Sequence, residues 1–591
     1  MGPGCCLGIG TPVTLGSKSV STPLNPFLTM KSCLLALFLL VPASLVSALT
    51  EIALSTNPEL LEFRGGASSD HLGCDASTST STLAAGDLNG DGINDIIIAS
   101  NDEATYGSIQ IVFGESSYSQ KLYRISNVVD VKIAGRSSEN FAEAIAIGDV
   151  NDDNVDDLIV GSSKADYNSL LNTGAVYVYF GRASWSSTLG VTDADVAIEG
   201  DVNGDSFGYA VTSGDVNGDG IDDVIASARS RDTNTLSNNG TVSLFFGRVT
   251  WPGTAMTIAD ADCELSGPRD SSNLGDSIWT GDFNDDGTDD LFMGAYHDDD
   301  PTHSGTPGYS GVLYGVLGGP TWASSATLSA ATADLYVTGT GTAVYGLGYR
   351  GACGDVNGDG VDDVVVLATD SPSPKTVFFY GDAAFAGLVS YDVVTDADYM
   401  IDYGNPNNNH GVPSSIACGD LDGDGIADIA VGFSTSSPNG LLFCGSTTIY
   451  YGRSVWGTDD PADVKYTGIA SSDYLGQNIG FGDINGDGLA ELMMNAPNND
   501  NSFNQAGAVY IIGGEASEVS TTFAISGGGF TFEVFSRSGR TLMLQSSTNL
   551  SSWTDLLTFN CDGSDYEMSD TLPTDDTFYR VVVNPPPEAA P

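Results

Sequence analysis

The amino-acid sequence predicts an all-β protein: a seven-bladed β-propeller with four-stranded blades, followed by a small C-terminal β-sandwich-like domain. Three observations support this prediction. One acidic nonapeptide recurs seven times, short apolar segments of strand length flank each copy, and no segment keeps a helical period. Glycine accounts for 73 of the 591 residues, which provides the tight turns that many short strands require.

The nonapeptide defines the length of the repeat. Its copies are DLNGDGIND, DVNDDNVDD, DVNGDGIDD, DFNDDGTDD, DVNGDGVDD, DLDGDGIAD and DINGDGLAE, which begin at Asp87, Asp149, Asp215, Asp282, Asp355, Asp420 and Asp483. Subtracting successive starts gives 62, 66, 67, 73, 65 and 63 residues. A period this regular indicates one supersecondary unit repeated seven times.

Each unit except the last contains four segments that resemble strands. In the second unit, FAEAIAIG (141–148) precedes the acidic loop and DLIVGSS (157–163) follows it. A polar loop then leads to GAVYVYFG (174–181), and DVAIEG (195–200) closes the unit. Short β-branched and aromatic segments at this spacing are typical of the four-stranded blades of a propeller.

A closed ring needs a connection between its first and last blades. The last unit lacks a fourth strand, whereas LLEFRGG (60–66) stands before the first acidic loop and matches the fourth strand of other units. We therefore predict that this N-terminal strand completes the last blade, which removes an exposed sheet edge. The propeller is expected to span residues 55–516.

The remaining segments have different compositions. Residues 30–48 have the apolar run and small-residue end of a signal peptide, and residues 1–29 are interpreted as a misassigned or disordered leader. Residues 519–584 alternate apolar and polar positions, which predicts a small all-β domain, and 585–591 are expected to be a disordered tail. The mature chain is expected to be secreted, with no membrane span.

The charge of the chain excludes some partners. Seventy-seven acidic and 20 basic side chains give a formal net charge of -57. This charge would repel nucleic acid and anionic lipid, so cations are the expected counterpart. A solvated acidic surface without specific ions is the alternative reading of composition alone.

The cysteines are scattered, without metal-type spacing. Cys353 and Cys418 occupy matching positions in two repeats and are expected to be small buried residues. A disulfide between Cys418 and Cys444 is the alternative that the sequence leaves open.

The nonapeptide has the composition of a calcium loop. Positions 1, 3 and 5 carry Asp or Asn oxygens, position 7 offers its carbonyl, and position 9 is Asp or Glu. Calcium prefers six to eight such oxygen ligands. The predicted ligands, loop by loop, are Asp87, Asn89, Asp91, Ile93 and Asp95; Asp149, Asn151, Asp153, Val155 and Asp157; Asp215, Asn217, Asp219, Ile221 and Asp223; Asp282, Asn284, Asp286, Thr288 and Asp290; Asp355, Asn357, Asp359, Val361 and Asp363; Asp420, Asp422, Asp424, Ile426 and Asp428; and Asp483, Asn485, Asp487, Leu489 and Glu491.

Two features favour about seven Ca²⁺ sites over ion-free turns. Position 6 is Gly in six copies and Asn154 in the other, and both residue types tolerate a left-handed backbone. Position 7 is apolar in most copies, so its side chain is expected to pack while its carbonyl binds the ion. An EF-hand is excluded because its position 12 needs Glu, where this chain has Ile98 or Ala226.

The chain resembles the FG-GAP repeats of integrin alpha-subunit heads over roughly residues 55–516. The F-G element stands at Phe207-Gly208 and is Leu-Gly at Leu274-Gly275 and Leu475-Gly476, and the G-A-P element is best matched by Asn495-Ala496-Pro497. The resemblance implies calcium on one face of the disk and ligands on the other. With calcium loops in all seven units, the chain is more similar to secreted microbial members than to a receptor subunit.

Catalytic signatures are scarce. The four histidines are His71, His297, His303 and His410, and AYHDDDPTH (295–303) is their one notable cluster. A solvated polar loop is the favoured interpretation of this cluster, with a metal or acid–base site as the alternative. The HExxH and P-loop patterns do not occur.

These observations predict a binding protein and not an enzyme. We expect a secreted, monomeric, calcium-binding propeller that acts in cell adhesion or binds a protein or glycan ligand outside the cell. Two alternatives remain: an extracellular hydrolase or lyase acting on polysaccharide, and a structural component of a cell envelope or matrix.

Overall fold

The computed structural model divides the chain into two units. One comprises Leu49–Asp422 with Ile426–Gly514, and the other comprises Met1–Ala48, Gly423–Gly425 and Glu515–Pro591. The structure describes residues 28–29, 50–54, 60–66, 71–73, 82–100, 106–118, 121–137, 139–253, 256–298, 310–329, 331–338, 346–369, 373–385, 387, 389–393, 395–404, 411–457, 462–500, 505–513, 520–526, 529–535, 541–547, 554–560, 566–571 and 578–584. The predicted signal peptide, nearly all of the leader and the tail lie outside these residues.

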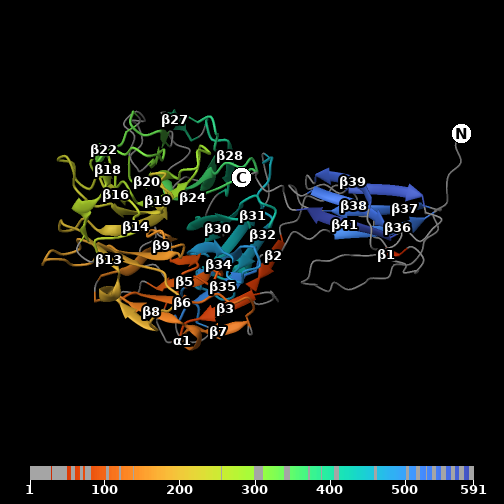
Figure 1. Cartoon of the computed structure of the whole chain (residues 1–591), viewed down its shortest axis with the longest axis horizontal. Coiled ribbons are helices and arrows are strands. Elements are labelled where there is room, and N and C mark those ends of the chain that lie inside the picture. The colour runs from red at the N-terminus through yellow and green to blue at the C-terminus, as the bar shows by residue number, and fades with distance from the viewer. Residues whose placement is uncertain are drawn as a thin grey trace. The chain divides into compact units, whose positions relative to one another are not determined.

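The first unit is a ring of seven antiparallel blades, which confirms the predicted fold (Figure 1). The innermost strands are β4 (Leu83–Gly86), β9 (Phe141–Gly148), β14 (Phe207–Gly214), β19 (Ser277–Gly281), β24 (Leu347–Gly354), β29 (Ser415–Gly419) and β33 (Ile479–Gly482). The second strands are β5 (Asp95–Ser100), β10 (Asp157–Ser162), β15 (Asp223–Ala228), β20 (Asp290–Ala295), β25 (Asp363–Ala368), β30 (Asp428–Phe433) and β34 (Glu491–Ala496).

The outer half of each blade follows the same order. The third strands are β6 (Ser108–Val112), β11 (Ala175–Tyr179), β16 (Thr241–Phe245), β21 (Val312–Val316), β26 (Lys375–Phe379), β31 (Ser446–Tyr450) and β35 (Ala508–Ile512). The fourth strands are β8 (Val131–Ala134), β13 (Val196–Glu199), β18 (Cys263–Ser266), β23 (Leu335–Thr338), β28 (Tyr399–Asp402), β32 (Val464–Thr467) and, in the last blade, β3 (Leu60–Arg64).

The N-terminal strand closes the ring as predicted. Strand β3 pairs antiparallel with β35, from Leu60 opposite Ile512 to Arg64 opposite Ala508. The innermost strands contact their neighbours in sequence around the circle, and β33 returns to β4. The last blade is therefore built from the two ends of the propeller sequence.

Among the described residues, a fifth strand that was not predicted from the sequence extends six of the seven blades. It comes from the following blade or from the N-terminal segment, and its described pairings with the fourth strand are all parallel. These strands are β12 (Thr188–Gly190), β17 (Met256–Thr257), β22 (Ser325–Thr327), β27 (Val389–Asp392), β2 (Thr50–Ala53) and β7 (Leu122–Arg124). Each fifth strand therefore links two neighbouring blades by backbone hydrogen bonds.

The hydrophobic core lies between the blades. The described residues form seven buried clusters, and each one joins two adjacent sheets. One cluster, for example, packs Ile97 and Ile111 of the first blade against Leu158 and Tyr177 of the second. Because a blade buries its faces only against its neighbours, stability depends on the complete ring.

Helices are short in the described part of the chain. They are α1 (Ile125–Val128) and the 3₁₀ turns η2 (Val191–Asp193), η3 (Ile258–Asp260) and η5 (Pro438–Gly440). A search of the described residues finds no helix with the length and hydropathy needed to span a bilayer. Cys418 and Cys444 are free thiols, so the structure does not contain the disulfide left open above, and Cys263 and Cys353 are free as well.

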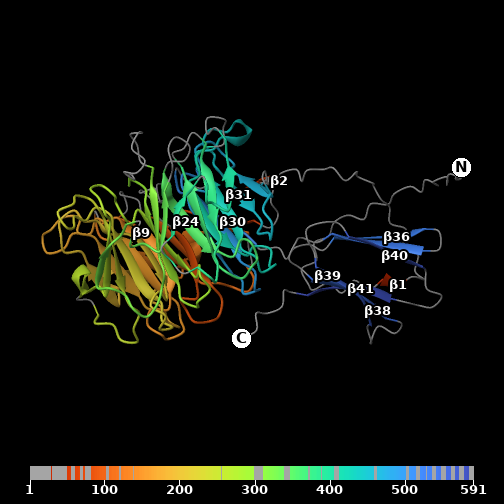
Figure 2. The ribbon, with the colours of Figure 1, turned by 90° about the horizontal axis from the view of Figure 1, so that it is seen from above.

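The second unit contains two sheets, which lie as separate layers in Figure 2. One has the order β36-β37-β40, and the other has the order β1-β41-β38-β39. Their bounds are β36 (Ser520–Ser526), β37 (Gly529–Phe535), β40 (Tyr566–Thr571), β1 (Leu28–Thr29), β41 (Phe578–Asn584), β38 (Thr541–Ser547) and β39 (Thr554–Asn560). This arrangement confirms the predicted sandwich-like domain.

Candidate metal centres

Each acidic nonapeptide connects the first and second strands of a blade, so all seven loops lie at the same ends of these strands. In the third loop, the Asp215 carboxylate accepts hydrogen bonds from the backbone N–H groups of Gly218, Asp219 and Gly220 at 2.7 to 3.0 Å. The position-5 carboxylate of Asp219 accepts the Ile221 N–H at 3.1 Å. The carboxylates at positions 1 and 5 therefore stabilise the turn by accepting hydrogen bonds from the backbone of the same loop.

The left-handed backbone predicted at position 6 is present in every loop. The φ angles there range from 63° at Asn154 to 91° at Gly360. Position 4 is also left-handed in all seven loops, with Asp152 and Asp285 at φ 60° and 52° and glycine in the other five. The sequence signal for this second requirement was the restriction of position 4 to Gly or Asp.

Position 9 has a structural role that the sequence did not reveal. Asp223 is fully buried and accepts hydrogen bonds from the Val216 N–H, the Asn217 side-chain amide and the Gly247 N–H, at 2.8 to 3.2 Å. Asp95 has the equivalent three donors. This carboxylate joins the loop to the end of the third strand, and a carboxylate with several donors still has lone pairs for an ion.

Burial changes the proton affinity of these carboxylates. Desolvation raises the pKa from the ordinary aspartate value of 3.8 to about 7 for Asp95, Asp223 and Asp290, and to about 8 for Asp157 and Asp363. Backbone N–H donors oppose the shift but are outweighed by burial. The neighbouring acidic side chains of the same loop raise the pKa further.

A pH dependence follows for the calcium-free protein. These groups hold protons more tightly in the folded chain than in the unfolded chain, so the folded state binds more protons between pH 4 and pH 8, roughly. The free energy of unfolding should therefore fall as pH rises through this window. We expect a higher melting temperature at about pH 5.5 than at about pH 8.5 in calcium-free buffer, measured by calorimetry. A melting temperature that rises with pH under these conditions would contradict this role of position 9.

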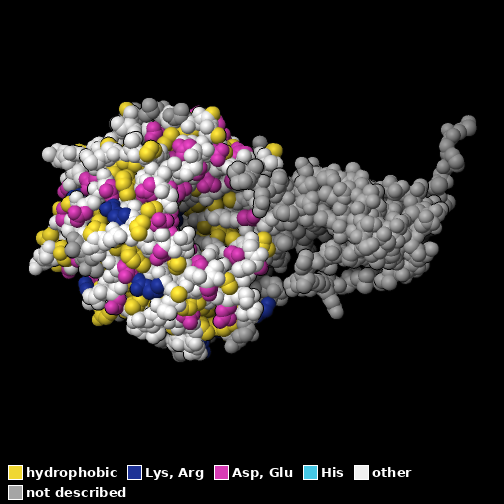
Figure 3. Space-filling model, viewed as in Figure 1, with side chains coloured by type: hydrophobic (Ala, Val, Ile, Leu, Met, Phe, Trp, Pro, Cys, Tyr) yellow, Lys and Arg dark blue, Asp and Glu magenta, His cyan; other side chains and the backbone are white. Residues whose placement is uncertain are grey.

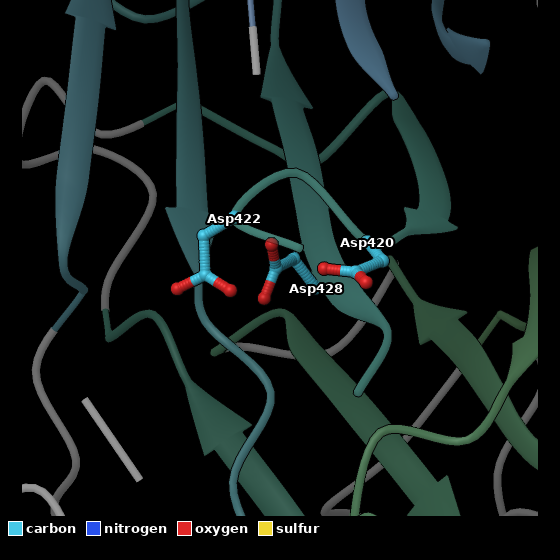
Figure 4. A group of neighbouring side chains, drawn as sticks. All are labelled: Asp420, Asp422 and Asp428. Atoms are coloured by element: carbon cyan, nitrogen blue, oxygen red, sulfur yellow. The ribbon is translucent and has the colours of Figure 1, made fainter. Parts of the chain in front are cut away.

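The sixth loop brings three carboxylates together. Single carboxylate oxygens of Asp420, Asp422 and Asp428 all lie within 4.8 Å of one another, and Figure 4 shows the three side chains gathered beside one turn. Among the described residues this is the one such group of His, Cys, Asp and Glu side chains. The other six loops carry Asn at position 3, as in the Asn217 contact above, so these loops have a neutral amide oxygen where the sixth loop has a third carboxylate.

The seven loops are hydrogen bonded to one another around the ring. In every loop, the N–H of position 8 donates to the carbonyl oxygen of position 1 in the preceding loop. The donor–acceptor pairs are Asn94–Asp483, Asp156–Asp87, Asp222–Asp149, Asp289–Asp215, Asp362–Asp282, Ala427–Asp355 and Ala490–Asp420, with N···O distances of 2.8 to 3.3 Å. This closed circle was not predicted from the sequence.

The side chain at position 8 reinforces this circle where it is acidic. Asp222 accepts the Asp149 N–H at 3.0 Å, and Asp156, Asp289 and Asp362 make the equivalent contact. Burial raises the pKa of Asp222 to about 6. The recurrence of Asp at position 8 in four copies was the available sequence signal for this contact.

A second motif ties neighbouring loops together. After the third strand, the sequence Gly-Arg-x-x-Trp recurs at 181–185, 247–251 and 452–456. The Trp251 indole N–H and the Arg248 backbone N–H both donate to the Val150 carbonyl, at position 2 of the preceding loop. The Arg248 guanidinium also lies 5.1 Å from the Trp251 ring centroid. This motif was not predicted from the sequence, although its spacing repeats.

The propeller has an excess of acidic side chains on the face that Figure 3 shows. Figure 3 shows many more acidic than basic side chains on the visible face of the propeller, which is hollowed near the middle of the ring. This distribution agrees with the expected preference for cations.

The histidine cluster is only partly described. His297 Nδ1 lies 3.0 Å from Asp276 Oδ2, whereas the neighbouring Asp298 is buried and pairs with Arg269. His303, like His410, lies outside the described residues. The described part of the chain therefore places His297 beside an aspartate from the start of its own blade.

Comparisons with known proteins agree with the repeat. The FG-GAP repeat family matches residues 79–112, 141–179, 207–245, 412–443 and 475–512, in five of the seven blades. Among curated proteins, phosphatidylinositol-glycan-specific phospholipase D is 28% identical over 181 residues in Dictyostelium discoideum and 26% identical over 157 residues in Homo sapiens. These alignments cover 27% and 26% of this chain. In each case the chain spans 18% of the length of the relative.

Among solved structures, the rhamnogalacturonan lyase PL11 of Bacillus licheniformis aligns over 85% of this chain and 78% of its own, with 11% identity and a TM-score of 0.29. The repeat matches, together with the ring of seven sheets, identify the architecture. The chain is a seven-bladed β-propeller that carries FG-GAP repeats in five of its blades.

Proposed function

We propose that the seven acidic loops bind calcium and that the chain is a secreted, calcium-stabilised propeller that binds a protein or glycan ligand outside the cell. One observation carries this proposal: seven oxygen-rich loops lie at equivalent strand ends and form a closed circle of hydrogen bonds. An ion in one loop would therefore stiffen its neighbours. FG-GAP repeats are typical of extracellular proteins, where calcium is abundant.

The side chains present suit a hard cation. Position 1, 3, 5 and 9 oxygens and the position 7 carbonyl would hold the ion, with water completing the shell. In the third loop, the side-chain N–H of Asn217 donates a hydrogen bond to Asp223. The Asn217 side-chain oxygen is therefore left to act as a ligand. The bound ion would supply positive charge that offsets repulsion among the loop carboxylates.

If the ions bind at the acidic loops and have a structural role, the strand ends opposite these loops are available to bind a ligand. There, variable loops follow the second strand of each blade, and loops on a rigid scaffold are the usual place for binding residues. An enzyme acting on polysaccharide is the second candidate, because His297 and Asp276 form a hydrogen-bonded pair at these strand ends.

Binding arrays test the proposed function. The full chain is applied to glycan and protein arrays in ~1 mM calcium and again in EDTA. We expect retention on a defined ligand that is lost in EDTA, with no cleavage of that ligand. Failure to retain any ligand in calcium would contradict the binding function, and cleavage abolished by His297→Ala would establish the enzyme instead.

A further inference from the structure

The fifth blade differs from the other six at its outer edge. Its sheet has the order β24-β25-β26-β28, whereas each of the other six sheets carries a parallel fifth strand beside its fourth strand. Within the described part of the chain, β28 (Tyr399–Asp402) is therefore an edge strand. An edge strand presents backbone N–H and C=O groups that can pair with another strand.

The lengths of the connections explain this exception. In five blades the fifth strand comes from the connection between the third and fourth strands of the following blade. Counting the residues between these two strands gives 18, 16, 17, 18 and 19 in the first five blades and 13 in the sixth, of which the structure describes 451–457 and 462–463. The sixth connection is at least three residues shorter, which is the length of β12. The segment that should complete the fifth blade is therefore too short to supply a strand.

The six existing fifth strands share one contact. In each pair, an apolar residue of the fifth strand lies beside an apolar residue of the fourth strand. The pairs are Leu189–Ile133, Met256–Ile198, Ala326–Leu265, Tyr391–Val337, Ile52–Tyr466 and Tyr123–Phe63. In five of the pairs the fifth-strand residue belongs to, or packs against, the hydrophobic cluster between its two blades. A fifth strand thus adds an apolar side chain to the core.

The cluster between the fifth and sixth blades has no such contribution among the described residues. Ile401 holds the position of Leu265, because DADYMI (396–401) aligns with DADCEL (260–265). Tyr399 lies on the same face of β28 as Ile401, and its ring centroid is 5.3 Å from that of Trp456. Both rings are only partly buried. They border the place that an apolar side chain of a fifth strand would occupy.

The backbone of β28 is available at the same edge. In the third blade, the Glu264 N–H donates to the Ser324 carbonyl at 3.1 Å, just before the fifth strand. In the fourth blade, the Thr338 carbonyl accepts the Val393 N–H at 3.0 Å. The corresponding groups of the fifth blade are the N–H and the carbonyl of its second and fourth edge residues, Met400 and Asp402. The structure records no bond from either group to a following segment within the residues that it describes.

We propose that the edge of β28 binds an extended segment of a partner polypeptide as a parallel fifth strand. The segment places an apolar residue beside Ile401 and carries basic residues on either side of it, because the net charge of -57 attracts cations. Strand addition to a sheet edge is a general mode of peptide recognition. This surface lies at the outer strand of a blade and not at the strand ends, so the proposal goes beyond the proposed function and does not depend on it.

A labelled peptide tests the surface by fluorescence anisotropy with the full chain. The probe is KVSYKV, which copies Val389–Tyr391 of β27 and adds the basic residues. Val389 and Val393 both donate their N–H groups to β23 or its preceding residue, so the N–H of Tyr391 between them faces the same way. One comparison peptide is therefore N-methylated at the tyrosine, and the other is the acidic EVSYEV. We expect KVSYKV to bind at least tenfold more tightly than either.

A graft that completes the fifth blade provides the matching variant. It replaces residues 457–461 by residues 186–193, which include β12, so that the sixth connection has the length found in the second blade. This graft should abolish binding of KVSYKV and raise the melting temperature, whereas a Gly/Ser replacement of equal length should leave binding unchanged. Met400→Pro, which removes the outward N–H, should weaken binding at least tenfold; the graft decides if this variant does not fold.

Several results would overturn the proposal. They are no binding of KVSYKV, equal binding of its N-methylated form, preference for EVSYEV, or undiminished binding to the graft. Dimers of the parent chain that the graft abolishes would assign the edge to a second copy of this chain instead.

Discussion

Removing calcium is expected to lower the melting temperature of the propeller by on the order of 10 °C. Dissociation constants of weak extracellular calcium sites are on the order of 10⁻⁴–10⁻³ M. A tenfold excess of calcium then contributes about 1.4 kcal/mol per site, or about 10 kcal/mol for seven independent sites. With an unfolding entropy of ~2.1 cal/mol/K per residue over about 460 residues, each kcal/mol of lost stability lowers the melting temperature by roughly 1 °C.

A matched pair of variants in the second loop separates this effect from general charge removal. Asp153 is a predicted ligand at position 5, whereas Asp152 is an exposed residue at position 4 that is not a predicted ligand. Asp153→Asn should reduce the calcium-dependent stabilisation by about one site, and Asp152→Asn should leave it unchanged because Asn tolerates the left-handed backbone. Calorimetry in calcium and in EDTA measures both. Identical melting curves of the parent chain in the two buffers would refute the calcium proposal.

Deleting residues 50–64 is expected to destabilise the ring more than any single substitution. The deletion removes β3, the fourth strand of the last blade, and β2, the fifth strand of the sixth blade. It also uncovers the edge of β35, where Val509 and Ile511 are buried. An uncovered apolar edge pairs with other chains, so we expect both a lower melting temperature and oligomers in size-exclusion chromatography.

Phe63→Ala tests the same closure with a smaller change. Phe63 is 1% exposed and stacks on Tyr123 from the first blade. Truncation of a buried Phe costs about 3–5 kcal/mol, and therefore about 3–5 °C for a propeller of this size. Val455→Ala, at a site 78% exposed, is the control and should not change the melt. Unchanged melting of both the deletion and Phe63→Ala would show that β3 does not close the ring.

The ring architecture was predictable because its signals are local and repeated. The nonapeptide fixes the position of each first hairpin, and the absence of a fourth segment after 507–514 indicated that 60–66 closes the last blade, as the pairing of β3 with β35 confirms. The fifth strands were not predictable in this way. Two- to four-residue segments such as Met256–Thr257 carry too few residues for a periodicity, and their pairing depends on the neighbouring blade.

The candidate site likewise has some features that could be predicted from the sequence and others that could not. The left-handed turn at position 6 follows from the residue types allowed there, and the structure confirms it. The burial of Asp223 and the circle of hydrogen bonds from position 8 to position 1 depend on contacts between strands and blades that sequence spacing does not encode. The hydrogen bond from Arg350 to Asn478 joins residues 128 positions apart across the central channel, and no local sequence pattern predicts it.

Native mass spectrometry of the full chain during a calcium titration tests the central claim most directly. The account predicts that seven calcium ions bind as calcium rises to about 1 mM, and that Asp153→Asn lowers this number by one. A chain that remains free of calcium at this concentration would contradict the claim that the acidic loops are ion sites.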